Sequence, residues 1–236
     1  MNAADRAIAA RILAALDLTS LGEDDSPEEI VELCAAATDG GHPAAVCVYP
    51  EHVTTARKTL AAAHAGDVAI ATVVNFPDGG NDIARVLRET RRALAAGADE
   101  IDVVFPWRAH LGGDREGGAL MLRECRAICG KKILKAILET GELGDPLLVR
   151  ELSLAAIGAG ADFIKTSTGK AKIGATPAAA RAMLECIRDT GGRTGFKAAG
   201  GVGTLADETL GDGWATPARF RIGASVLLAE LRAALA

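Results

Sequence analysis

Eight short apolar runs recur along this chain of 236 residues, and a helical segment follows each of them. Most of the runs are continuously apolar, as expected for strands that are covered on both faces. They occupy residues 14–18, 44–49, 68–74, 100–105, 132–138, 162–167, 195–200 and 219–224. Because parallel neighbours need a long crossover connection, this alternation predicts a parallel sheet whose strands are joined by helices.

The segments between the runs carry helix start and stop signals. "SPEEIVELCAAA" opens with Ser-Pro and an acidic first turn, and "ATPAAARAMLECIRDTGG" opens with Thr-Pro and ends at glycine. Eight such units, in a length close to the ~250 residues that is typical, predict one (β/α)8 barrel over residues 1–236, with a short N-terminal helix. A doubly wound open sheet is the alternative, but it needs a glycine-rich first turn, which "LDLTSLGEDDS" lacks.

Charge and composition exclude several classes of partner. The net charge is −5 and no basic run is present, which argues against a nucleic-acid partner. The five cysteines form no C-x-x-C pair and indicate reduced thiols in a cytosol, and the four histidines have no spacing that predicts a metal site. The amino-terminal segment lacks the apolar core of a signal peptide, and no apolar run reaches the ~18 residues of a membrane span. We therefore expect a soluble cytoplasmic protein that binds neither nucleic acid nor membrane.

Charged residues interrupt four consecutive apolar runs. They are Asp102, Lys135, Lys165 and Lys197, at separations of 33, 30 and 32 residues. These separations are close to the ~30 residues of one strand–helix unit, so we expect equivalent places on neighbouring strands. In a barrel all four would then meet at the C-terminal, catalytic end of the interior. The alternative is that the lysines point outward past the helices, but surface lysines have no reason to keep this register.

Three amines and one carboxylate in a small cavity have a chemical consequence. An isolated lysine has a pKa near 10.4, and both a neighbouring ammonium and removal from water lower that pKa. The neutral amine attacks a carbonyl carbon and forms a Schiff base, and the iminium then accepts electrons as a carbon–carbon bond breaks. The constellation is typical of a class I aldolase.

Six motifs lie on or beside the predicted strands: "LDLTSL", "ATVVNFPDG", "EIDVVFPW", "LKAILETGEL", "DFIKTSTGK" and "GFKAAGGV". Together they resemble the 2-deoxyribose-5-phosphate aldolase family, from about residue 12 to the C-terminal helix. The resemblance implies that Lys165 forms the Schiff base, that Lys197 tunes it and that Asp102 relays protons. It further implies that Lys135, Asp17 and Thr166 belong to the network around the substrate.

The implied reaction is reversible cleavage of 2-deoxy-D-ribose 5-phosphate to D-glyceraldehyde 3-phosphate and acetaldehyde, without a metal or organic cofactor. The implied partners are a small phosphosugar and small aldehydes, and the family also admits a homodimer. Two alternatives stay open: a Schiff-base aldolase with a different aldehyde pair, and a non-catalytic barrel that binds phosphosugars. The lysine pair and Asp102 argue against the second, because binding alone needs no amine with a lowered pKa.

Phosphate is often bound on the loops after the last two strands of a barrel and at a helix N-terminus. The candidates in this sequence are Gly169, Lys170, Gly200, Gly201, Gly223 and Ser225. Purely structural turn glycines are the alternative. The chain departs from the family at Gly203, where arginine is common, at Val226, where a second serine is usual, and in lacking a C-terminal tyrosine. The segment between Thr204 and Trp214 is also short. We therefore expect weaker phosphate binding and a helix of one or two turns there.

Overall fold

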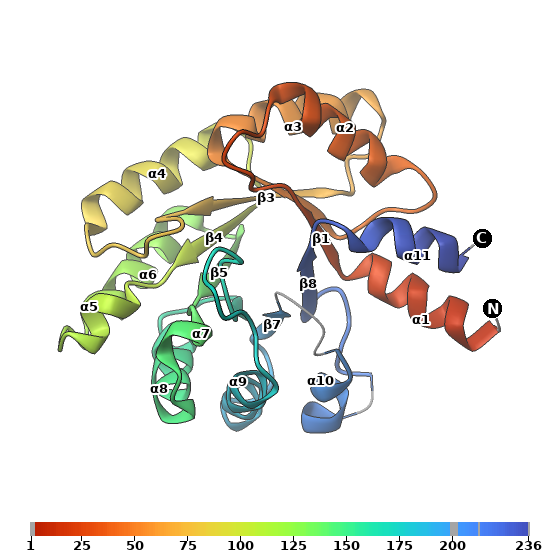
Figure 1. Ribbon diagram of the computed structural model, residues 1–236. Helices are drawn as coiled ribbons and strands as arrows, with labels where there is room; N and C mark the ends of the chain where they lie inside the picture. The colour runs from red at the N-terminus through yellow and green to blue at the C-terminus, as the bar shows by residue number, and fades with distance from the viewer. Residues whose placement is uncertain (1–2, 199–202, 212, 236) are drawn as a thin grey trace.

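The computed structural model describes residues 3–198, 203–211 and 213–235 of the chain. In this part, eight parallel strands pair in sequence order and close into a barrel, because the first strand also pairs with the last (Figure 1). The strands are β1 (Leu16–Thr19), β2 (Ala45–Val48), β3 (Ala69–Val74), β4 (Glu100–Val104), β5 (Ile133–Ile137), β6 (Phe163–Lys165), β7 (Gly195–Ala198) and β8 (Phe220–Ala224). The predicted (β/α)8 fold is confirmed, and the closed barrel rules out the open doubly wound sheet.

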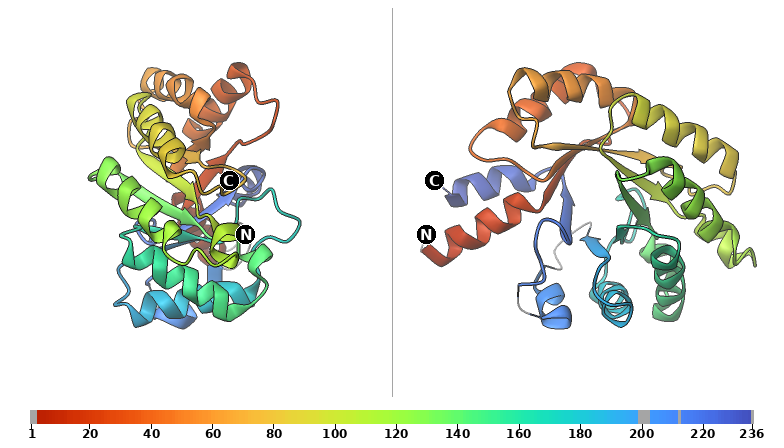
Figure 2. Two further views of the ribbon diagram at one scale, coloured as in Figure 1. Left: turned by 90° about the vertical axis from the view of Figure 1, so that its left-hand side faces the viewer. Right: turned by 180° about the vertical axis from the view of Figure 1, so that it is seen from behind.

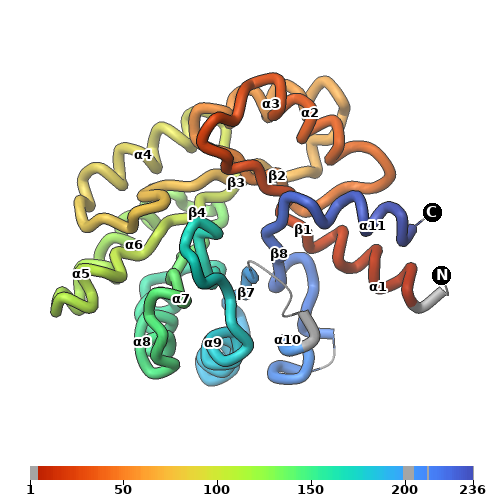
Figure 3. The backbone as a smooth tube through the Cα atoms, in the orientation of Figure 1, coloured from red at the N-terminus to blue at the C-terminus, as the bar shows by residue number. Residues whose placement is uncertain are grey.

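Helices surround the strands in an outer ring (Figures 1 and 2). They are α1 (Ala3–Ala14), α2 (Pro27–Thr38), η1 (Pro50–His52), α3 (Val53–Ala62), α4 (Ile83–Ala95), α5 (Trp107–Leu111), α6 (Gly117–Cys129), α7 (Thr140–Leu143), α8 (Pro146–Gly158), α9 (Pro177–Asp189), α10 (Gly203–Leu210) and α11 (Leu227–Leu235). Helix α1 precedes the barrel and packs beside α11, so the two ends of the chain lie close together (Figure 3). The short α10 agrees with the length expected between strands 7 and 8.

Side-chain caps fix where several of these helices begin. The side-chain oxygens of Ser26, Asp82, Asp145 and Thr176 each accept a hydrogen bond from a backbone N–H in the first turn of the following helix. Each cap satisfies one of the N–H groups that a helix start leaves without a partner. The caps therefore define where α2, α4, α8 and α9 begin.

The tetrapeptide AGAD occurs twice, directly before β4 and directly before β6. In both places the aspartate accepts the backbone N–H of a neighbouring strand, from Ile70 to Asp99 at 3.1 Å and from Leu134 to Asp162 at 2.8 Å. These bonds lie at the N-terminal ends of the strands, the end of a barrel that serves stability. They fix the register of the strands that carry the charged residues described below.

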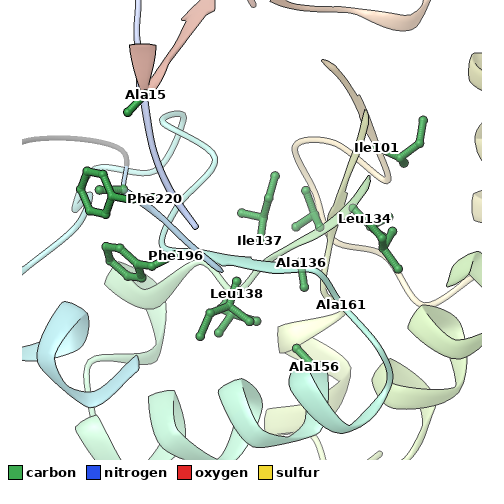
Figure 4. Close-up of a cluster of buried hydrophobic side chains, with 14 of the residues drawn as sticks. Ala15, Ile101, Leu134, Ala136, Ile137, Leu138, Ala156, Ala161, Phe196 and Phe220 are labelled. Atoms are coloured by element: carbon green, nitrogen blue, oxygen red, sulfur yellow. The ribbon is translucent and has the colours of Figure 1, made fainter. Parts of the chain in front are cut away.

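Residues that flank the charged positions face the helices. Ile101, Leu134, Ala136 and Phe196 are fully buried and belong to the apolar layer between sheet and helices (Figure 4). Since side chains alternate between the two faces of a strand, their charged neighbours point into the barrel. Continued once around the barrel, the strand register returns to β1 displaced by eight residues, the shear of a (β/α)8 barrel.

No described helix combines the length and the apolar character needed to cross a membrane.

Candidate active site

Among the described residues of the barrel strands, seven charged side chains are buried in the interior. They are Asp17, Glu100, Asp102, Lys135, Lys165, Lys197 and Arg221. The most exposed of them, Arg221, is 6% exposed. Buried charges are tolerated when they are paired, and these side chains contact one another across the barrel.

The register sorts the interior side chains into layers, each taken from alternate strands. Three successive layers, from the one nearer the C-terminal end inward, are Cys47, Asp102, Lys165 and Gly223, then Asp17, Ala71, Lys135 and Lys197, then Ala45, Glu100, Phe163 and Arg221. Lys135 and Lys197 lie one layer deeper than Lys165, so the charged side chains meet in the interior at two heights. Neighbouring strands of a barrel are staggered, so equal spacing in the sequence is not equal height.

Asp102 is the centre of the amine cluster. Its Oδ1 accepts a hydrogen bond from Lys135 Nζ at 2.7 Å. Its Oδ2 accepts from both Lys165 Nζ at 3.0 Å and Lys197 Nζ at 2.9 Å. Lys165 and Lys197, which are register partners on neighbouring strands, thus share one carboxylate oxygen. The three predicted lysines are brought together as expected.

Two further carboxylates lie below Asp102. Asp17 Oδ2 is 2.5 Å from Lys197 Nζ and 3.5 Å from Lys135 Nζ. Glu100 Oε2 is 2.5 Å from Lys135 Nζ. Arg221 donates to Asp17 Oδ1 at 2.8 Å and to Glu100 Oε1 at 3.2 Å. The cluster therefore contains three carboxylates: Asp102 and Asp17, which were expected there, and Glu100, which was not.

The cluster contains one more basic group than it has carboxylates. Three carboxylates face four basic groups, and three of the basic groups contact two or more carboxylates. Lys165 is the exception, because among the described residues its amine is paired with Asp102 alone, which also pairs with Lys135 and Lys197. If one basic group of this set is to lose its proton, Lys165 is the one with the least compensation.

The pKa shifts follow this geometry. Burial, and then the ammonium of Lys197, lower the pKa of Lys165, and the Asp102 carboxylate offsets this only in part. Burial acts on Lys197 as well, but the carboxylates of Asp102 and Asp17 outweigh it and hold the pKa of Lys197 well above its usual range. The carboxylates of Asp102 and Glu100 act on Lys135 in the same way, so the pKa of Lys135 also lies above the usual lysine value. Lys165 is thus the lysine of the cluster that gives up its proton most readily.

The pKa values of Asp102 and Asp17 are lowered, because positive charges surround both carboxylates. Burial alone would raise the pKa of Asp102, but the ammonium groups of Lys135, Lys197 and Lys165 hold it well below the usual range. The pKa of Asp17 is lowered by Lys197, Lys135 and Arg221 against the same effect of burial. Both carboxylates are therefore ionised at neutral pH.

The interior face of β2 and β3 is apolar. Ala45, Cys47, Ala71 and Val73 of β2 and β3 form a buried cluster together with Leu21. Tyr49 and Phe76 pack against it edge to face, with ring centroids 5.8 Å apart. Burial raises the pKa of Cys47, which disfavours the nucleophilic thiolate form. One wall of the cavity beside Lys165 is thus uncharged and built mainly from small side chains.

The loop after β5 holds the end of β6. The carboxylate of Glu139, 4% exposed, accepts the backbone N–H of Thr168 at 3.1 Å. The backbone N–H of Thr140 donates to Thr166 O at 2.8 Å, and the N–H of Thr166 donates to Lys197 O at 3.1 Å. Thr166 is buried directly after Lys165, so these bonds position the segment that carries the Lys165 amine.

The predicted phosphate-binding residues lie in different surroundings in the structure. Gly169 and Lys170 lie on the exposed loop after β6, where the N–H of Lys170 donates to Thr168 Oγ1 at 3.0 Å. Ser225 is exposed between β8 and α11, whereas Gly223 lies within β8, where an added Cβ would be 3.4 Å from Lys197 Cε. Gly223 thus lets the Lys197 side chain approach β8 closely. Gly200 and Gly201 lie outside the described residues, and the phosphate site stays a prediction.

Sequence reasoning missed Glu100 and Arg221. Glu100 precedes Asp102 by two residues on one strand and therefore shares its face, a signal that was available. Arg221 lies on β8 opposite Lys197. Its spacing from Lys197 is shorter than a full strand–helix unit, because α10 is short, so the spacing rule did not select it.

A hollow lies outside the barrel. It has a volume of about 740 Å³ and is lined by Ile8, Ile12, Phe220, Ile222 and Leu227 among others, between α1, α11 and the outer face of β8. None of the seven interior charged residues lines it. It is therefore separate from the amine cluster.

The comparison with protein families settles the membership of this chain. A family model described as DeoC/LacD family aldolase matches residues 11–232. The chain belongs to the DeoC/LacD family of aldolases. The matched range of this aldolase includes all seven interior charged residues.

Solved structures agree with this membership. A candidate deoxyribose-phosphate aldolase of Toxoplasma gondii superimposes with a TM-score of 0.91 at 25% identity, covering 99% of this chain and 98% of its own. A candidate deoxyribose-phosphate aldolase of Coccidioides immitis gives a TM-score of 0.81 at 28% identity, covering 95% and 87%. An aldolase named QR15 gives 0.77 at 30% identity, covering 92% of each chain. The DeoC/LacD barrel is thus shared over nearly the whole length.

Proposed function

We propose that this aldolase reversibly cleaves 2-deoxy-D-ribose 5-phosphate to D-glyceraldehyde 3-phosphate and acetaldehyde through a Schiff base on Lys165. The observation that carries the proposal is the surplus amine. Lys165 is buried, its pKa is lowered, and it contacts a carboxylate that is already shared with two other ammonium groups. A lowered pKa raises the neutral fraction of this amine, and the neutral amine is a nucleophile toward an aldehyde carbon.

The forward reaction begins at the aldehyde. Lys165 Nζ adds to C1, and the carbinolamine loses one water to give an iminium ion. Removal of the proton from the C3 hydroxyl lets the C2–C3 bond break, and its electron pair moves to the iminium. This step releases D-glyceraldehyde 3-phosphate and leaves an enamine. The enamine takes up a proton at C2, and one water then hydrolyses the new iminium to acetaldehyde and the free amine of Lys165.

We assign the proton transfers to Asp102, acting through a water molecule. Its low pKa makes Asp102 a weak base that passes a proton on rather than holding it. Lys197 lowers the pKa of Lys165, since the two amines share Asp102 Oδ2. Lys135, Asp17 and Thr166 are proposed to order the polar groups around the substrate hydroxyls.

The substrate is inferred from likeness as well as from chemistry. Relatives that are 25% and 28% identical carry the deoxyribose-phosphate aldolase name. The small apolar wall of β2 and β3 suits the short acetaldehyde-derived fragment bound to Lys165. A Schiff-base aldolase with a different aldehyde pair is the main rival, because Val226 stands where the family usually carries serine. A non-catalytic phosphosugar-binding barrel is the other rival.

We further propose that the chain assembles as a homodimer. A deoxyribose phosphate aldolase of Aeropyrum pernix, 23% identical, is described as tetrameric. Ile8 and Val226 expose 54% and 78% of their surface beside the outer hollow, and apolar surface of this kind is often covered in oligomers. Light scattering of the purified protein should give twice the chain mass, and the mass of a single chain would contradict the proposal.

Reductive trapping tests the reaction. Acetaldehyde with borohydride should leave an ethyl group on Lys165, identified by peptide mass mapping, and should abolish cleavage of 2-deoxy-D-ribose 5-phosphate. Lys165→Met is the matched control, because it keeps the length of the side chain and removes the amine. An adduct on a different lysine, or none, would exclude the mechanism. Trapping at Lys165 without cleavage of this phosphosugar would instead favour another aldehyde pair.

A further inference from the structure

Arg221 lies at the bottom of the amine cluster, two layers below Lys165. Its guanidinium is held between Asp17 of β1 and Glu100 of β4, at 2.8 Å and 3.2 Å. Its Nε donates to Pro217 O at 2.6 Å, and its plane lies over the ring of Phe163 at 5.6 Å. These contacts fix the guanidinium in the interior, out of reach of a substrate bound at Lys165.

An unbroken series of charge contacts joins Arg221 to Lys165. Arg221 binds one oxygen of Asp17, and the other oxygen of Asp17 is 2.5 Å from Lys197 Nζ. Lys197 is 2.9 Å from Asp102 Oδ2, and that oxygen is 3.0 Å from Lys165 Nζ. All five side chains are buried, so water screens their interactions weakly.

We propose that Arg221 is a positioning residue that sets the pH at which the Lys165 amine loses its proton, by supplying the third fixed positive charge of the barrel interior. With Arg221 present, Lys135, Lys197 and Arg221 balance the three carboxylates, and a proton on Lys165 is in excess. Without Arg221, the carboxylates outnumber the fixed cations, and a protonated Lys165 restores the balance.

The sign of the effect follows from this balance. Removing a buried positive charge favours the charged form of Lys165, so its deprotonation moves to higher pH. Removing a buried negative charge does the reverse. A unit charge ~10 Å away in a medium of effective dielectric ~20 changes the ratio of neutral to charged amine by about tenfold, or about one pH unit.

The groups that face the two ends of this series belong to several strands. Lys165 faces Asp102 of β4, Lys197 of β7 and Cys47 of β2. Arg221 faces Asp17 of β1 and Glu100 of β4, lies beside Lys197 in the register and shares both of its carboxylates with Lys135 of β5.

The experiment measures the proton on Lys165 without any substrate. The inference rests on the proposed role of Lys165, but trace acetylation by acetic anhydride reports the neutral fraction of each lysine even in a protein that cleaves no phosphosugar. Peptide mass mapping across pH 5 to 11 gives the midpoint for Lys165. Exposed Lys131 serves as the internal standard. Loss of the proposed function and loss of this inference are therefore separate results.

Four variants separate charge from structure. Arg221→Met should raise the Lys165 midpoint by about one pH unit, and Glu100→Gln should lower it by a similar amount. The double variant removes one charge of each sign and should return the midpoint close to that of the native protein. Arg221→Lys keeps the charge and should leave the midpoint in place.

Three results would overturn the inference. They are an unmoved midpoint in Arg221→Met, a fall instead of a rise, or a double variant shifted as far as Arg221→Met. A purely structural role would lower the Tm and the rate at every pH without moving the midpoint. If Arg221→Met does not fold, Glu100→Gln and the double variant still test the inference. The Lys165 midpoint must fall in Glu100→Gln, and it must stay near the native value in the double variant.

Discussion

A single pair of lysines illustrates how this barrel separates two proton affinities within a few ångströms. Lys165 and Lys197 occupy neighbouring strands and share one oxygen of Asp102, yet their pKa values are displaced in opposite directions. The difference lies in the second carboxylate. Lys197 also contacts Asp17, whereas Lys165 has no such partner among the described side chains.

Replacing Lys197 tests this separation. Lys197→Met removes the ammonium that disfavours a proton on Lys165, so the pKa of Lys165 should rise. Two ammonium groups at ~5 Å repel by roughly 3 kcal/mol at an effective dielectric of ~20, which is about a hundredfold in the neutral fraction. Because only the neutral amine attacks the aldehyde, kcat/KM should fall by up to about a hundredfold at pH 7 and recover toward pH 9.5.

The matched control is Lys135→Met, which removes the same charge from the same layer. Lys135 contacts Asp102 through Oδ1 rather than through the oxygen that Lys165 uses. We expect a smaller displacement of the pH profile. A loss in Lys197→Met that is equal at every pH would show that Lys197 acts on the substrate instead.

At the scale of elements, the lysine that we propose as the nucleophile lies on the shortest described strand of the barrel. Strand β6 comprises three residues, Phe163–Lys165, so its own ladder holds Lys165 weakly. The loop after β5 supplies the missing support. Leu138 N donates to Lys165 O at 2.9 Å, and Glu139 accepts the N–H of Thr168. Glu139 adopts the left-handed backbone conformation, with φ of 53°.

Substituting Glu139 tests this support. Glu139→Ala leaves the buried N–H of Thr168 without its acceptor, which costs roughly 1–3 kcal/mol. The segment from Thr166 to Lys170 should loosen, so hydrogen exchange at Thr168 should accelerate and KM should rise more than kcat falls. Glu139→Gln keeps a carbonyl acceptor and should retain most of the affinity. Equal losses in both variants would indicate that the negative charge is the essential property.

The sequence predicts the positions of the strands well, but it does not predict the hydrogen bonds by which the loop after β5 holds the end of β6. Continuous apolar runs locate buried strands such as β4 and β5 within one or two residues, because burial on both faces leaves no other pattern. The relative height of Lys135 and Lys165 depends on the stagger between strands, which no single strand encodes. The bond from Thr168 to Glu139 joins a side chain to a distant backbone group, and such a bond has no periodic signature.

At the scale of the whole molecule, burial of the Lys165 amine makes the stability of the fold depend on pH. The pKa of Lys165 is lowered in the folded state, so over the range between its folded and unfolded values the unfolded chain binds more protons. The free energy of unfolding must then rise with pH over that range, up to the ordinary lysine value near 10.4. At neutral pH, Lys165 therefore destabilises the fold.

Lys165→Met should therefore be more stable than the native protein at pH 7, by a few degrees in Tm, since ~1 kcal/mol shifts Tm by about 2–4 °C at this size. The gain should shrink as the pH approaches 10. Thermal unfolding at several pH values measures it. Lys58→Met, at an exposed position, should show no such trend. A less stable Lys165→Met at pH 7 would mean that the ion pair with Asp102 outweighs burial.

The division of the barrel wall also bears on how such an enzyme can diverge. On β2 and β3 the interior side chains are uncharged and mainly small, so a substitution there alters the shape of the cavity without disturbing any ion pair. On the remaining strands, a change at one charged position leaves a partner uncompensated. We expect new aldehyde preferences to arise by single substitutions on β2 and β3, while the charged part of the wall changes only through coordinated replacements.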